Sequence, residues 1–146
     1  MKINFSIVHK PLTISKIKAP GQTIQVYQEN QSINLQATKD AVAYLQYALS
    51  NKIPVIVGVS NVPGGPNSDK STNHWVVIVG SGTDSNGNYF RFYDSGATNQ
   101  VNRATSVANK LYYNPTTGEF KGTSDTNYGA AAAYQMTMVR KSKKIL

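Results

Sequence analysis

The stretch HWVVIVGSGTDSNGNYFRFYDSG, residues 74–96, decides the fold of this 146-residue chain. It holds two strand-like runs, Trp75–Gly80 and Tyr89–Asp94, separated by the segment 81–88, which is rich in Gly, Asn, Asp and Ser. Runs of β-branched and aromatic residues that flank such turn-forming residues pair as antiparallel strands. The stretch therefore predicts a β-hairpin.

Further strands and one helix are expected on either side of this hairpin. The continuous β-branched run Ile53–Val59 predicts a buried strand, and Pro54 is tolerated there because it lies at the start. Apolar residues recur at helical spacing over 38–51, with Thr38 as the expected N-cap. Another hairpin is expected around Pro115, from 110–114 and 118–121, and a closing strand over 134–140.

These elements predict a single α+β domain, a mostly antiparallel sheet with one main helix. We divide it into an irregular, extended N-terminal segment (1–37), a core (38–140) and a basic tail (141–146). A chain of this length forms one hydrophobic core. No apolar run approaches the length of a membrane span, and no signal-peptide core is readable at the N-terminus.

The chain is basic, with 15 Lys and Arg against 7 Asp and Glu and a net charge of +8. Long-range attraction therefore favours anionic partners. Four of the basic residues lie at the C-terminal end: Arg140, Lys141, Lys143 and Lys144. Without them the net charge is +4. We favour a solubilising tail over a nucleic-acid contact for this segment. Nucleic-acid binding ranks last because the sequence lacks regular interleaving of aromatic and basic residues.

His74 and Asp94 are the candidate catalytic residues. His74 stands where a long polar loop, 60–73, becomes an apolar strand, and Asp94 ends the next strand. If the connection is centred on residue 84, the two lie directly opposite each other on one face of the hairpin. A tight turn on Asn86-Gly87 would instead direct Asp94 to the other face unless a bulge intervenes. The alternative for His74 is a strand-end histidine bonded to backbone.

No cofactor or metal is expected. The other histidine, His9, lies in a weakly patterned region beside Pro11, and the scattered carboxylates match no ligand spacing. The chain contains no cysteine, which removes disulfides, thiolate metal sites and a thiol nucleophile. The compartment is left open, because a chain without cysteine suits either side of a membrane.

In their order, the segments 53–59, 73–80 and 89–96 resemble the C-terminal part of papain-like cysteine peptidases, and in particular bacteriocin-processing peptidases and papain-like toxin domains of bacterial polymorphic toxins. The resemblance covers residues 38–140 and implies the sheet half of a papain-like fold. It implies that His74 is the general base and that Asp94 orients it. Asn73 and Trp75, on either side of His74, are expected to contact a substrate.

The resemblance also implies a cysteine nucleophile at the start of an upstream helix, and no residue here matches it. Ser6 and Ser15 lie upstream, but too few residues separate Ser15 from Pro20 for the required helix. We therefore expect a peptidase or amidase-type domain that is inactive alone: a fragment, a split product or an inactive relative. The localisation is not determined by the sequence, and the resemblance to toxin domains is compatible with secretion or delivery as an effector.

Two other hypotheses are consistent with the sequence. One is a non-catalytic binding module that presents the loop 60–73 and its basic surface to a protein or an anionic polymer. The other concerns assembly: the sheet of the resembled fold needs a helix over one face, so a cysteine-bearing segment or a second copy of the chain is an expected partner. Residues 1–37 could fill the same gap. Peptides or proteins are thus the expected substrates and partners.

Overall fold

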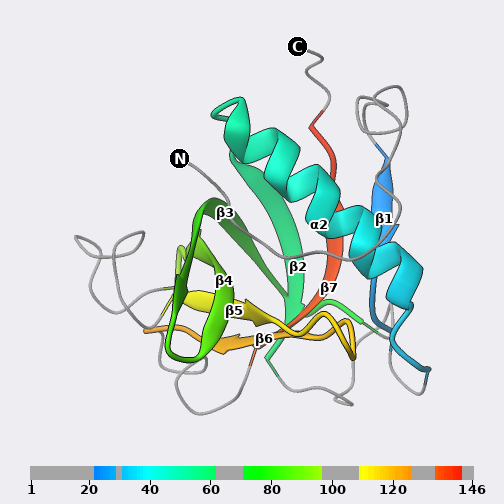
Figure 1. Ribbon diagram of the computed structural model, residues 1–146. Coiled ribbons are helices and arrows are strands. Elements are labelled where there is room, and N and C mark those ends of the chain that lie inside the picture. Colours follow the sequence, from blue (N-terminus) through cyan, green and yellow to red (C-terminus); the bar gives the residue numbers. More distant parts are fainter. Residues whose placement is uncertain (1–21, 29–30, 62–70, 97–108, 126–133, 143–146) are drawn as a thin grey trace.

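The computed structural model describes residues 22–28, 31–61, 71–96, 109–125 and 134–142 (Figure 1). Along the chain the elements are as follows: β1 Thr23–Gln25, α2 Leu35–Ser50, β2 Val55–Ser60, β3 His74–Asp84, β4 Gly87–Tyr93, β5 Lys110–Tyr113, β6 Phe120–Thr123 and β7 Tyr134–Arg140. The structure thus confirms, within a few residues, the strands predicted over 53–59, 75–80, 89–94, 110–114, 118–121 and 134–140. No helix in the described part is long and apolar enough to cross a membrane.

The strands form a closed barrel, and here the predicted fold class is wrong. All pairings between strands are antiparallel, in the order β1-β7-β2-β3-β4-β5-β6, and β6 also pairs with β7, so that six strands make a ring. The molecule is a mostly β barrel with one helix rather than an α+β half of a papain-like fold. Closure depends on Lys121 and Gly122 meeting Gln135 and Tyr134, a contact between separate segments that strand patterning alone does not reveal.

The turn between β3 and β4 differs from both registers considered for it. Asp84 pairs with Gly87, so Ser85 and Asn86 form the turn, and Gly87 has a φ of 119° that favours glycine. The register shifts between Ile78 and Gly80, which leaves Val79 as an extra residue in β3. Beyond the bulge Ile78 pairs with Phe92, so the even-numbered residues of β3 from 74 to 78 share a face with the even-numbered residues of β4.

Helix α2 starts three residues earlier than predicted. Its N-cap is Asn34, whose Oδ1 accepts a hydrogen bond from the Ala37 amide at 2.9 Å. The expected cap, Thr38, lies inside the first turn instead, where its hydroxyl donates to the Asn34 carbonyl. The predicted apolar stripe is confirmed as the buried face: Ala41, Val42, Leu45, Ala48 and Leu49.

That stripe packs on the inner face of the barrel to form one core. The barrel contributes Val55, Val57 and Val59 from β2 and aromatic side chains from β4, β6 and β7, among them Phe90 and Phe92. Figure 1 shows α2 lying across β2 and β7. The helix therefore covers the sheet over these two strands, and Val76 and Ile78 of β3 belong to the same core.

The C-terminal basic residues are partly built into the fold. Arg140 ends β7, and its guanidinium lies 4.7 Å from the centre of the Trp75 ring. The Lys141 amide donates to the Gln22 carbonyl at 3.0 Å, and the Lys141 side chain is buried beside Tyr44. The tail predicted over 141–146 thus begins with an ordered residue, and 143–146 lie outside the described residues, as do 1–21 and the middle of the predicted loop, 62–70.

Candidate functional site

His74 begins β3, where it pairs with Val59 of β2. Its side chain is 17% exposed, and its Nε2 lies 2.9 Å from Asp94 Oδ1. Because the bulge at Val79 puts both residues on the inner face, the side chains meet diagonally rather than directly opposite each other. The predicted hydrogen bond is present, reached through a different register from the one that predicted it.

Asp94 follows β4 and is fully buried. Its Oδ1 accepts a second hydrogen bond, from the Gly96 amide at 2.9 Å. Its Oδ2 accepts hydrogen bonds from the hydroxyls of Ser124 at 2.9 Å and Tyr134 at 2.8 Å. Four donors thus surround one carboxylate, an arrangement that offsets the cost of removing a charge from water.

These donors decide the ionisation of Asp94. Burial alone raises the pKa of the carboxyl, but the hydrogen bonds from His74, Gly96, Tyr134 and Ser124 outweigh it and hold the pKa below its ordinary value. The group is therefore a carboxylate at neutral pH. An ionised carboxylate only accepts hydrogen bonds, so the Nε2 of His74 carries the proton between them.

The donors to Oδ2 were not predicted from the sequence. Ser124 directly follows β6, and Tyr134 begins β7. A third buried residue, Asn109, lies behind them: its Oδ1 accepts from the Asp125 amide at 3.1 Å and lies 3.3 Å from the Ser124 hydroxyl oxygen. No spacing motif marks these residues, because barrel closure between β6 and β7 brings them to Asp94.

The Tyr134 ring also forms a wall of the site. Its centre lies 5.8 Å from that of the His74 ring and 5.9 Å from that of Phe92. Packing against an aromatic ring and bonding to a buried carboxylate together restrict the orientation of the imidazole. With the proton on Nε2, the neutral ring has its lone pair on Nδ1, so Nδ1 is the atom suited to accept a proton.

Asn73 and Trp75, the two predicted substrate contacts, are both exposed, whereas His74 between them is partly buried. Asn73 is exposed, and its side chain pairs with Asn61 across the start of the β2–β3 connection, with Nδ2 2.6 Å from Asn61 Oδ1. Trp75 lies on the outer face of β3, because successive residues of a strand alternate between faces. Their role in binding a substrate stays a prediction.

The serine beside Asp94 is not available as a nucleophile, and the described residues form no metal site. Ser124 is buried and donates its hydroxyl to Asp94, so it is not presented to a substrate. In the described ranges no three side chains of the metal-binding types gather. His9, Ser6 and Ser15 lie outside those ranges, and the sequence has no cysteine.

A histidine bonded to a buried carboxylate is also the arrangement by which an imidazole is oriented as the base for a nucleophile. The family model described as "Peptidase_C39 like family" matches residues 5–121, and the chain belongs to this family, which is related to the papain-like cysteine peptidases. The match includes most of the segment 1–37 that the predicted resemblance left out. No curated protein and no solved structure matches the chain.

Proposed function

We propose that this chain carries the base half of a peptidase or amidase site, with His74 as general base and Asp94 as the residue that orients it, and that a thiol outside this chain completes the site. The observation that carries the proposal is the bond between His74 Nε2 and a fully buried Asp94 with three further donors. Family membership supports the reaction class.

The chemistry follows from the tautomer. Nδ1 of His74 takes the proton of the incoming thiol, and the thiolate attacks the carbonyl carbon of a peptide or amide bond. The resulting imidazolium gives its proton to the leaving amine, and a thioester remains. Water then attacks the thioester with His74 again as base, which releases the acid and restores the thiol. Asp94 stabilises the imidazolium without itself taking the proton.

Without the thiol, the chain alone should not hydrolyse peptides. The resemblance of the His74 and Asp94 segments to papain-like toxin domains supports a further proposal, that the domain acts as a bacterial toxin or effector. A non-catalytic binding module, the other function predicted from the sequence, is favoured by one observation of its own: apolar side chains gather on the opposite face of β3.

The base role can be tested with a small thiol in place of the missing nucleophile. The measurement is the exchange of a peptide thioester with 2-mercaptoethanol, followed by mass spectrometry. General base catalysis contributes factors of about 10²–10⁴ in enzymes. Because the protein does not hold 2-mercaptoethanol in place, we expect the wild type to accelerate the exchange by only about tenfold. We expect His74→Ala to remove the acceleration and His9→Ala, the matched control, to retain it. Equal rates for wild type and His74→Ala would contradict the proposal.

A further inference from the structure

Large apolar side chains are exposed together on the outer face of β2 and β3. Ile56 is 50% exposed, and Trp75 and Val79 are each 38% exposed. Only one other large hydrophobic in the described residues is comparably exposed, Leu35 at the start of α2. Single exposed apolar residues are ordinary, but a contiguous group marks an interaction surface.

The strand register makes this group contiguous. Ile56 pairs with Val77 and Gly58 with Trp75, so Ile56 lies diagonal to both Trp75 and Val79 across the two strands. On its other side Ile56 pairs with Arg140 of β7, whose guanidinium lies over the Trp75 ring at 4.7 Å. We call Ile56, Trp75, Val79 and Arg140 the outer patch.

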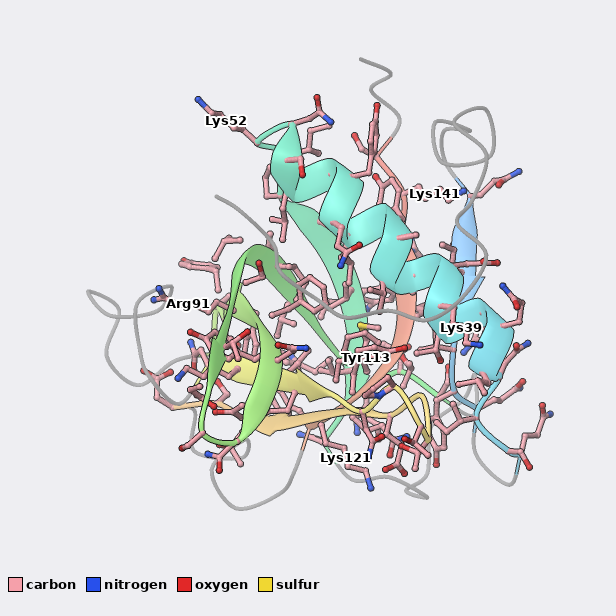
Figure 2. All side chains as sticks on the ribbon, viewed as in Figure 1. Lys39, Lys52, Arg91, Tyr113, Lys121 and Lys141 are labelled. Carbon is pink, nitrogen blue, oxygen red and sulfur yellow. The ribbon has the colours of Figure 1, made fainter. Side chains whose placement is uncertain are left out.

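A cavity continues the outer patch toward the end of α2. It has a volume of about 360 Å³ and is lined by Leu49, Lys52, Ile53, Pro54 and Val79. Val79, the bulge residue, belongs to both the cavity and the outer patch. Four of the lining residues are apolar, and Lys52 supplies the one charge. Figure 2 shows Lys52 extending outward at the C-terminal end of α2.

Two exposed cations border this surface. Arg140 stands at one side of the outer patch and Lys52 at the cavity, and both are exposed. Along β3 the nearest acidic residue is Asp84, at the far end of the strand, and its Oδ2 already accepts from Lys110 at 2.9 Å and Tyr112 at 2.8 Å. An occupant with carboxylates would therefore meet complementary charge on both sides.

We propose that the outer patch and the cavity are a docking site for an acidic segment of another protein that inserts an apolar side chain beside Val79. An apolar pocket is what a side-chain anchor fills, and Trp and Arg are the residue types that dominate the energies of protein interfaces. Ile56 and Val79 offer aliphatic contacts, and the guanidinium of Arg140 lies over the Trp75 ring, whereas a single-stranded nucleic acid stacks its bases on a series of open aromatic faces.

Selection from a random peptide library on the wild-type chain tests this directly. We expect the enriched peptides to combine acidic residues with a large apolar residue. Fluorescence anisotropy with one enriched peptide should give affinities at least tenfold weaker for Lys52→Glu and for Trp75→Ala. Lys39→Glu makes the same charge change at the opposite end of α2 (Figure 2), and Leu35→Ala removes an equally exposed apolar side chain; both should retain the affinity.

Other results would overturn the proposal. Enrichment of peptides without acidic residues, or no enrichment, excludes an acidic segment as the occupant. An equal loss in Lys39→Glu shows attraction to overall charge alone. Displacement of the peptide by single-stranded oligo(dT) assigns the surface to nucleic acid. Self-association in sedimentation that Trp75→Ala abolishes assigns it to a second copy of the chain. None of these measurements depends on His74 or on thioester exchange.

Discussion

His74 Nε2 and Asp94 Oδ1 lie 2.9 Å apart, although the two residues are not cross-strand partners. The extra residue Val79 places them on one face of the barrel, and the carboxylate is then held from behind by groups that come from β6 and β7. The barrel therefore orients the imidazole through a buried anion, and this arrangement makes specific predictions.

Asp94→Asn should release the His74 ring from its single tautomer. The asparagine side chain has one oxygen acceptor where the carboxylate has two. Either His74 or the hydroxyls of Ser124 and Tyr134 then face an NH₂ group instead of an acceptor. Long-range ¹H–¹⁵N correlation spectra should show the Nε2–H tautomer for the neutral ring in the wild type and a mixture in the variant. Only two histidines are present, so His9→Ala assigns the signals. A wild-type ring with its proton on Nδ1 would contradict the assigned geometry.

Ser124→Ala and Tyr134→Phe should each destabilise the fold by about 1–3 kcal/mol, because each removes a donor from a buried carboxylate oxygen. Both hydroxyls bind Oδ2, so their effects in urea unfolding should deviate from additivity in the double variant by about 0.5 kcal/mol or more. Ser95→Ala removes an exposed hydroxyl next to Asp94 and serves as the control, with an expected change within about 0.5 kcal/mol. Additive effects would mean that the two hydroxyls do not share the carboxylate.

Stability should fall in acid because of Asp94. Its pKa is lower in the folded chain than in the unfolded one, so the stabilisation is present above the ordinary aspartate pKa of about 3.9 and is lost as the pH falls through the folded value. Asp84, whose pKa the bonds from Lys110 and Tyr112 also lower, adds to the same slope. Urea unfolding between pH 7 and pH 2 should show a shallower acid loss for Asp94→Asn than for the wild type. Parallel curves would exclude Asp94 as a contributor.

Gly122→Ala should open the barrel. Gly122 pairs with Leu111 of β5 and with Tyr134 of β7, and a Cβ there would collide with the Lys110 carbonyl oxygen, which belongs to the backbone and has little freedom to move. The expected loss of stability is about 3 kcal/mol or more, beyond the usual range for point variants. Lys121→Ala, at the exposed neighbouring position, should be nearly neutral. Because closure positions Tyr134, the variant should also lose the single His74 tautomer.

The sequence alone determined the local elements and the two central residues. Alternation and turn chemistry predicted the 74–96 hairpin, helical spacing predicted the buried stripe of α2, and the ends of the hairpin strands pointed to His74 and Asp94. These are properties of neighbouring residues, so a local pattern is enough to predict them. The lack of a cysteine is likewise read directly from composition.

Only the tertiary structure decided that the sheet closes into a barrel, that a bulge at Val79 sets the face of His74, and that Ser124 and Tyr134 hold Asp94. The same is true of the outer patch, where Arg140 reaches Trp75 from a strand far away in the chain. Each depends on pairing between segments distant in sequence. Such pairing is selected by burial of the whole core, and no local pattern records it.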